Sequence, residues 1–146
     1  MKKAFTMIEL VFVIVILGIL AAVALPRMNN SSLQATIAKG RADVATIRSA
    51  IVNERQTRLI TGESVWISEL SQNANTPLFD GNGSSVLLMY GITAGANSGD
   101  WSRNVAPNDN QYVYRVGTTQ TTFTYDNTDG TFTCVAGNAN CDDLIQ

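Results

Sequence analysis

The 146-residue chain has no histidine, only two cysteines and three prolines, and 15% of its residues are charged. The lack of histidine removes both the commonest general base and the commonest metal ligand. No residue can therefore activate a serine as histidine does, and neither a nucleophile-elbow motif nor a phosphate-loop motif occurs. We expect no catalytic residue, no metal, no cofactor and no enzymatic activity.

Hydrophobic residues make up 45% of the chain, and the excess is concentrated in the first 25 residues. Residues 1–4 form a short leader that carries Lys2 and Lys3, and residues 10–25 contain no polar side chain. As a helix, residues 5–25 would be roughly 30 Å long, which is enough to cross the core of a bilayer. By the positive-inside rule the two lysines keep the N-terminus in the cytoplasm. The sequence therefore predicts one membrane pass, with all later residues outside the cytoplasm.

An ordinary secretory signal peptide is the alternative interpretation of this segment. Ala22-Val23-Ala24 has the small-x-small form of a signal peptidase site. Against this, the apolar run is longer than an ordinary signal core and contains Glu9 near its start. It also continues directly into a second helical segment. These features favour a retained membrane helix.

Residues 26–60 are predicted to continue the helix past Pro26 as an amphipathic segment. Five apolar residues recur at spacings of 4, 7, 3 and 4, which places them in one stripe on a helix. They are Leu33, Ile37, Val44, Ile47 and Ile51. Thr61-Gly62 is a typical helix end, so the predicted helix runs from Phe5 to about Leu59.

Residues 61–146 have the composition of loops and strands. Residues 65–70 are predicted to form a short helical turn, and residues 75–85, which are rich in Asn, Gly, Ser and Pro, a loop. Alternating side chains predict strands at 111–116, 121–125 and 131–134. The sequence thus predicts an α+β fold, in which a long N-terminal helix packs its second half on a small antiparallel β-sheet head.

Charge is distributed unevenly between the two parts that follow the apolar segment. Residues 27–60 hold six Lys or Arg and two Asp or Glu, a net charge of +4. Residues 61–146 hold two Arg and nine Asp or Glu, a net charge of −7. Because nucleic-acid binding needs clustered basic residues, the acidic head predicts no direct nucleic-acid binding. Both charged parts are also compatible with ordinary solvated surfaces.

The N-terminal segment Lys2-Lys3-Ala4-Phe5-Thr6-Met7-Ile8-Glu9-Leu10 resembles the processing site of the type IV pilins and the type II secretion pseudopilins. In that family a membrane peptidase cuts directly before a Phe and methylates the new amine. The resemblance implies cleavage between Ala4 and Phe5, with N-methylation of Phe5. It departs from the family at Ala4, where the family nearly always has Gly.

The resemblance also implies roles for four further residues. Glu9 occupies the family's acidic fifth position of the mature chain, where its carboxylate would pair with the N-terminal amine of a neighbouring subunit during assembly. A carboxylate in a membrane helix is costly unless it is paired. Thr6 would help to satisfy the same polar region. Gly18 and Pro26 match the family's usual glycine and proline, and Pro26 permits a helix kink.

Cys134 and Cys141 are expected to lie outside the cytoplasm, where disulfides persist. We predict that they form a disulfide, the alternative being two free thiols. Residues 126–130 offer oxygen ligands, and some secretion pseudopilins hold calcium in the head. Their spacing is that of a hairpin turn rather than of an EF-hand loop, so a turn is favoured.

The resemblance predicts a subunit that polymerises into an envelope filament with itself and with other pilin-like subunits. A type II secretion pseudopilus is favoured because the head is small and has no extended surface loop. A type IV pilus or a DNA-uptake pilus is the alternative, and a membrane-anchored binding protein is less favoured. The implied partners are a prepilin peptidase and methylase, an inner-membrane assembly platform and membrane lipid. The implied location is the inner membrane, with the head in the periplasm, and then the filament.

Overall fold

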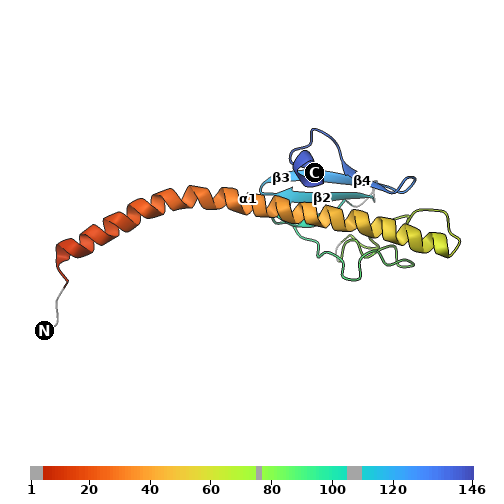
Figure 1. Ribbon diagram of the computed structural model, residues 1–146, viewed down its shortest axis with the longest axis horizontal. Helices are drawn as coiled ribbons and strands as arrows, with labels where there is room; N and C mark the ends of the chain where they lie inside the picture. Colours follow the sequence, from red (N-terminus) through yellow and green to blue (C-terminus); the bar gives the residue numbers. More distant parts are fainter. Residues whose placement is uncertain (1–4, 75–76, 105–109) are drawn as a thin grey trace. The chain divides into compact units, whose positions relative to one another are not determined.

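The computed structural model describes residues 5–74, 77–104 and 110–146, and the side chains of residues 23–30 are not among the described atoms. Within these residues the elements are a long helix, a four-stranded sheet and a short C-terminal helix (Figure 1). They are α1 (Met7–Ile60), β1 (Trp101–Arg103), β2 (Gln111–Val116), β3 (Thr119–Asp126), β4 (Thr131–Cys134) and α2 (Cys141–Ile145). The predicted α+β fold, a long N-terminal helix followed by an antiparallel sheet, is confirmed.

The chain divides into two compact units, one that ends at Ala35 and one that runs from Thr36 to Gln146. We call the second unit the head; it includes the second half of α1. Helix α1 ends at the predicted place. Gly62 has a φ of 90° and donates to the carbonyl of Leu59 at 3.2 Å, while the Glu63 amide donates to Arg58 at 2.9 Å. This pair of hydrogen bonds is a Schellman motif, which terminates the helix at a glycine.

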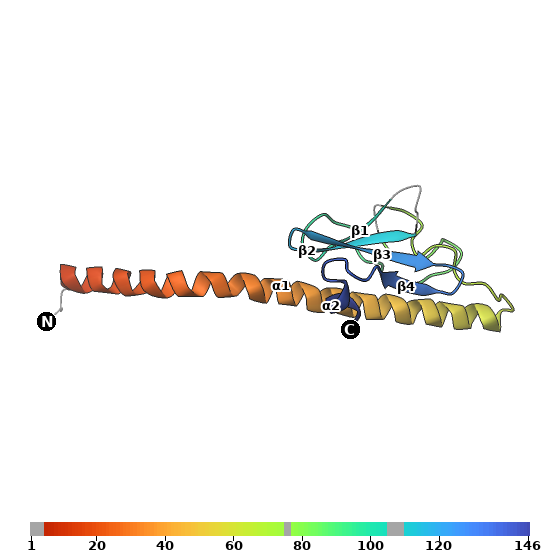
Figure 2. The same ribbon diagram turned by 90° about the horizontal axis from the view of Figure 1, so that it is seen from above.

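The sheet has the order β1-β2-β3-β4, and every neighbouring pair is antiparallel (Figure 2). Strands β2, β3 and β4 lie where alternation predicted strands. The sequence analysis missed β1, which has only three residues and pairs Trp101 with Tyr114 of β2. One carbonyl of β4 is used by α1, because the Phe132 carbonyl accepts a 3.0 Å hydrogen bond from Nε of Arg48.

The core of the head lies between the apolar stripe of α1 and one aromatic face of the sheet. The stripe contributes Ile37, Val44, Ile47 and Ile51, all buried. The sheet contributes large side chains of alternate residues, namely Trp101, Tyr112, Tyr114, Phe123, Tyr125 and Phe132. Leu33 was predicted to belong to the stripe, but it lies in the other compact unit and is 39% exposed.

Three buried aromatic side chains satisfy their polar atoms by hydrogen bonds to backbone or carboxylate oxygens. The Tyr114 hydroxyl donates to the Thr36 carbonyl at 2.7 Å, and Tyr125 donates to the Ile67 carbonyl at 2.9 Å. Nε1 of Trp101 donates to Oδ2 of Asp43 at 3.0 Å. Burial raises the pKa of Tyr114 and of Tyr125 to about 12, so both tyrosines are neutral donors at ordinary pH.

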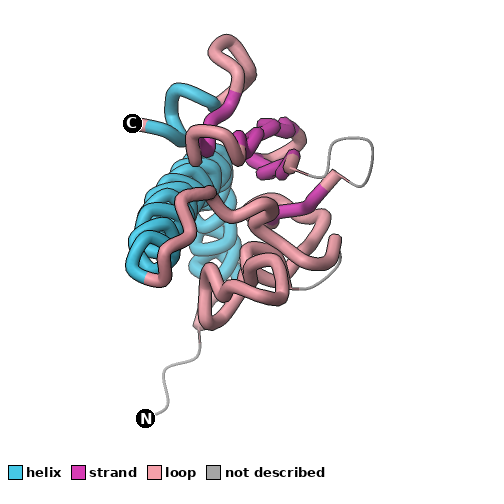
Figure 3. Tube along the Cα trace, turned by 90° about the vertical axis from the view of Figure 1, so that its right-hand side faces the viewer, coloured by secondary structure: helices cyan, strands magenta, loops and turns pink. Residues whose placement is uncertain are grey.

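The segment between α1 and β1 is irregular (Figure 3), and no helix or named strand occurs in its described residues. The helical turn predicted at residues 65–70 is therefore wrong. Ile67 and Leu70 are fully buried in the core, and the Ile67 carbonyl is used by Tyr125 instead of by a helix hydrogen bond. Tertiary contacts override local propensity here. The predicted loop at 75–85 is irregular over residues 77–85, and residues 75–76 lie outside the described part.

Candidate assembly segment and the head surface

The N-terminal polar residues lie together at the start of α1. Thr6 precedes the first helical residue, and its hydroxyl accepts from the Glu9 amide at 3.4 Å. The same hydroxyl donates to the Glu9 carboxylate, also at 3.4 Å. The Thr-x-x-Glu spacing is that of a capping box, and the structure shows its first half, in which the Thr6 hydroxyl caps the Glu9 amide. The structure therefore gives Thr6 a second role, as the residue that caps α1 and holds Glu9 close.

All described side chains from Phe5 to Ala22 are exposed, on every face of the helix. An all-round apolar helix requires an apolar environment, whether lipid or other helices. In the described residues no helix is long and apolar enough to cross a membrane. The predicted span continues to residue 25, and residues 23–25 are among those whose side chains are not described.

The structure does not test the roles predicted for three of the site residues. Ala4, the residue before the predicted cut, lies outside the described residues. A Cβ added at Gly18 would meet no atom within 4 Å, so local packing does not explain the glycine. Helix α1 is assigned without interruption through Pro26. The kink at Pro26 stays a prediction.

The basic side chains described in the head contact other groups of the head. Each of the seven Lys and Arg described from Thr36 onward contacts a carbonyl, a carboxylate, a hydroxyl or an aromatic ring. They are Lys39, Arg41, Arg48, Arg55, Arg58, Arg103 and Arg115. These cations tie α1 and the loops to the rest of the head, and Lys39 and Arg41 among them are also exposed to solvent.

Cys134 at the end of β4 and Cys141 at the start of α2 form a disulfide. Cys141 and Leu144 are fully buried. Nε and Nη2 of Arg41 on α1 both donate to the Asp143 carbonyl, at 3.0 and 2.8 Å. The disulfide fastens the five-residue helix α2 to β4, and the forked contact of Arg41 fastens it to α1.

The turn between β3 and β4 uses its own acidic side chains. Oδ1 of Asp126 accepts from the amide and the hydroxyl of Thr128, at 2.8 and 2.6 Å. Oδ1 of Asp129 accepts likewise from Thr131, at 2.9 and 2.7 Å. The hydrogen bonds of Thr128 lower the pKa of Asp126. This is the hairpin turn that the sequence favoured, and no cluster of metal-ligating side chains occurs within the part of the chain that is described.

The two tryptophans are packing residues of the head. Trp101 is fully buried in the core. Trp66 lies between the Arg55 guanidinium, 5.0 Å from the centre of its ring, and the turn at Gly130. Gly130 has a φ of 77°, and a Cβ there would overlap the Trp66 ring. Trp66 therefore fastens the β3–β4 turn to α1.

Two residues of α1 were missed by the sequence analysis. Gly40 and Glu54 lie on the buried stripe, at the positions that continue the spacing of Ile37, Val44, Ile47 and Ile51. Because Gly40 and Glu54 interrupt an otherwise apolar stripe, the sequence alone could have marked both positions as unusual. Gly40 allows Tyr114 and Leu144 to approach α1 closely, and Glu54 is a buried carboxylate.

Comparison with known proteins agrees with the motif and the fold. Residues 1–25 match the prokaryotic N-terminal methylation motif. The chain therefore carries a prokaryotic N-terminal methylation motif at the start of an α+β fold.

The particular relatives are pilus and fimbrial proteins. The chain is 52% identical over 48 residues to the type IV narrow pilus major component of Thermus thermophilus. The matched residues cover 33% of this chain and 41% of that protein. It is 26% identical over 95 residues to a fimbrial protein of Pseudomonas aeruginosa, covering 60% and 59%. It is 35% identical over 63 residues to a type IV major fimbrial protein of Dichelobacter nodosus, covering 43% and 38%. No solved structure matches.

The chain thus spans about two fifths to three fifths of the length of these relatives. Their names are those of structural filament proteins and not of enzymes, in agreement with the expected absence of enzymatic activity. The relatives are named as pilus components and none of the three as a secretion pseudopilin. They favour the pilus, which the sequence analysis gave as the alternative, over the pseudopilus that it preferred.

Proposed function

We propose that this chain is the repeating subunit of a type IV pilus. The observation that carries the proposal is the combination of the methylation motif over residues 1–25 with relatives that are pilus and fimbrial components. The small head, which favoured a secretion pseudopilus, is a weaker argument, because head size does not determine which filament a subunit enters. A DNA-uptake filament would use the same assembly steps, and no observation favours it.

In this proposal the chain is made as a precursor in the inner membrane, with its N-terminus in the cytoplasm and its head in the periplasm. Residues 1–4 form the leader and residues 5–25 the membrane and assembly helix. Residues 26–60 continue that helix into the head, and residues 61–146 complete the head. A prepilin peptidase cuts between Ala4 and Phe5 and methylates the new amine of Phe5.

Assembly then moves the exposed apolar surface of residues 5–22 from lipid into a bundle with other subunits. Apolar helices gain no hydrophobic drive toward one register inside lipid, so a polar contact can select it. Glu9 would supply this contact by pairing with the Phe5 amine of a neighbouring subunit. Thr6 supports it, because its two contacts with Glu9 keep the carboxylate near the start of α1. The other partners are pilin-like subunits and an inner-membrane assembly platform.

The test is made on the protein from its native host. Intact mass and N-terminal sequencing should give a chain that begins with methylated Phe5. Antibodies against the head should label long surface fibres that shear from the cells. A chain that begins at Leu25 would establish the signal-peptide interpretation. Correct processing with short filaments confined to the periplasm would favour a pseudopilus.

A further inference from the structure

A groove of about 830 Å³ lies in the head, between α1 and the segment formed by residues 84–89. Small and polar side chains line the α1 wall, among them Ser49, Asn53 and Thr57. The opposite wall carries two exposed apolar side chains, Val86 at 70% and Met89 at 83% exposure. The groove therefore combines a hydrogen-bonding wall with an apolar rim.

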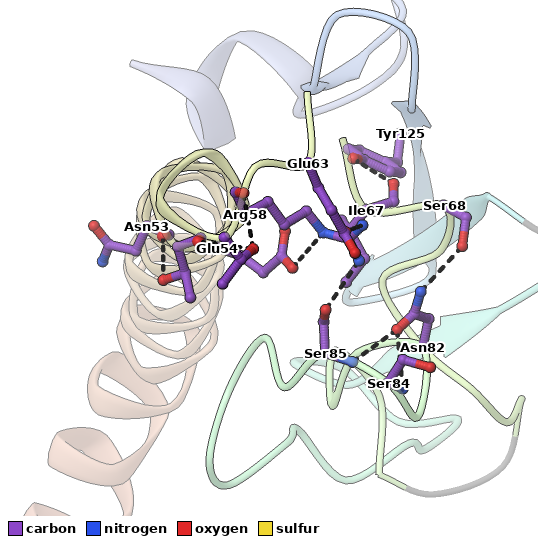
Figure 4. A network of polar contacts seen from close by, with 12 residues as sticks. Asn53, Glu54, Arg58, Glu63, Ile67, Ser68, Asn82, Ser84, Ser85 and Tyr125 are labelled. Atoms are coloured by element: carbon purple, nitrogen blue, oxygen red, sulfur yellow. Dashed lines mark hydrogen bonds and ion pairs between the residues drawn. The ribbon is translucent and has the colours of Figure 1, made fainter. Parts of the chain in front are cut away.

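Glu54 on the α1 wall has one carboxylate oxygen with no hydrogen-bond partner. The residue is 8% exposed, and its Oε1 accepts from Nε of Arg58 at 2.6 Å (Figure 4). Among the described residues its Oε2 has no hydrogen-bond partner and is out of contact with solvent. A buried carboxylate oxygen without a partner is unfavourable, and in a native protein it calls for an explanation.

The charged groups around Glu54 also carry more negative than positive charge. Nη1 of Arg58 also bonds to Oε2 of Glu63 at 2.9 Å, so two carboxylates share one guanidinium. The guanidinium of Arg55, the neighbouring cation, lies instead over the ring of Trp66, and among the described residues its buried Nη1 has no hydrogen-bond partner either. The three groups Glu54, Arg58 and Glu63 carry a net charge of −1. One further cation next to Oε2 would neutralise the cluster and satisfy the free oxygen.

We propose that the groove binds a lysine side chain carried by an extended segment of another protein. The apolar rim of Val86 and Met89 would cover the methylene stem, and the ammonium would reach Oε2 of Glu54. Lysine is favoured over arginine because its ammonium is a compact point charge, suited to a single oxygen, whereas arginine recognises two oxygens through its planar fork.

The segment comes from another protein and not from a second head of this chain. Each Lys and Arg that the structure describes in the head already contacts its own head, as shown above. A lysine from a neighbouring head would first have to break its existing contact, and the free energy of that loss would offset the free energy gained in the groove. A different protein with an unengaged lysine incurs no such cost.

Binding requires a small movement of the 84–89 wall, because Oε2 is covered. Nη2 of Arg58 holds this wall through a 2.9 Å hydrogen bond to Oγ of Ser85 (Figure 4). Ser85→Ala removes this hydrogen bond, so the groove should open more easily and bind a lysine peptide more tightly. Glu54→Gln removes the charge that the lysine seeks and should bind it more weakly.

The experiment is an NMR titration of the isotope-labelled full chain in detergent micelles. The probes are acetyl-Gly-Leu-Lys-Leu-Gly-amide and the same peptide with norleucine in place of lysine. We expect saturable shifts at the amides of Asn53, Thr57 and Met89, with the lysine peptide bound at least tenfold more tightly. Glu54→Gln should abolish the preference for lysine. Glu63→Gln, which removes an equal charge from Arg58 outside the groove, should retain it.

Several outcomes would overturn the proposal. They are the absence of shifts at these amides, equal affinity for the two peptides, or an equal loss of preference in Glu54→Gln and Glu63→Gln. Concentration-dependent shifts at the same amides without any peptide would show that a second copy of the chain occupies the groove. None of these results bears on filament assembly, which is measured separately.

Discussion

The ring of Tyr114 lies directly against the backbone of Gly40, and its hydroxyl donates a 2.7 Å hydrogen bond to the Thr36 carbonyl one turn earlier. Leu144 of α2 approaches the same glycine, so a Cβ added there would lie 2.6 Å from Cδ2 of Leu144. Gly40 is thus the point where the sheet and α2 both meet α1. Its lack of a side chain sets the distance between these elements.

Gly40→Ala should therefore destabilise the head, although alanine is the better helix former. Alanine gains about 1 kcal/mol in helix propensity, but overpacking a filled core costs about 1–3 kcal/mol, and Gly40→Val should be worse. Thermal unfolding of the full chain in detergent, followed by tryptophan fluorescence, measures the effect. Gly18→Ala is the control, since its Cβ meets no atom. A Gly40→Ala protein that is as stable as the Gly18→Ala protein would contradict this account of the packing.

Asp43 should make the stability of the head depend on pH. Burial raises its pKa above 3.8, against the opposing effects of the Trp101 hydrogen bond and of Lys39. A raised folded-state pKa adds stability at low pH that is lost as the pH rises through the folded pKa. The wild-type protein should therefore gain stability relative to Asp43→Asn as the pH falls from neutral toward 3.8.

Denaturant unfolding at several pH values tests this prediction, with the difference in unfolding free energy between the two proteins as the readout. Asp126 acts in the other direction, because its lowered pKa means that stability is lost only as the pH falls through that lower value. Asp126 is present in both proteins, so its effect cancels in the comparison. A difference that stays constant with pH would show that Asp43 titrates normally.

Removal of the disulfide should destabilise α2 and the part of the head that it covers. The bridge joins residues seven positions apart, and closing so short a loop contributes about 2–3 kcal/mol by the chain-entropy argument. Cys134→Ser/Cys141→Ser should lower the unfolding free energy by about this amount and should increase hydrogen exchange at the Leu144 amide. An unchanged exchange rate would mean that Arg41 alone holds α2 in place.

The sequence predicted the elements that depend on local signals. Thr61-Gly62 ended the helix as expected, because a glycine with positive φ satisfies the last carbonyls through nearby amides. The strands at residues 111–134 followed from alternation and from turn residues.

The features that the sequence did not reveal depend on contacts between distant residues. Strand β1 has three residues and exists through its pairing with β2, and Ile67 gives its carbonyl to Tyr125 instead of to a helical turn. The contacts that the basic residues make with the head could not be predicted for the same reason. The partner of Arg48 is the carbonyl of Phe132, 84 positions away. Of the assembly segment, the sequence predicted Phe5, Thr6 and Glu9 as a motif, and the structure adds the cap that joins Thr6 to Glu9.

Because of this cap, a Glu9 substitution could act on assembly in two ways, through loss of the charge or through loss of the contact with Thr6. Variants of both residues separate the two effects. Glu9→Leu removes both the charge that would pair with the Phe5 amine and the contact of the Glu9 carboxylate with the Thr6 hydroxyl. Thr6→Ala removes the capping hydroxyl but keeps the charge, and loss of a cap costs about 1 kcal/mol. An unpaired buried charge costs about 3–5 kcal/mol. If charge pairing drives assembly, the two variants should differ strongly.

The most direct measurement is the amount of sheared filament recovered from cells that make each variant, relative to the processed subunit in the membrane fraction. We predict that Glu9→Leu is cleaved and retained in the membrane but yields no ordered filaments. Glu9→Asp, which keeps the charge with a shorter reach, should yield few, and Thr6→Ala should yield nearly the wild-type amount. Normal filaments from Glu9→Leu would contradict the paired-charge mechanism, as would a failure of Thr6→Ala as complete as that of Glu9→Leu.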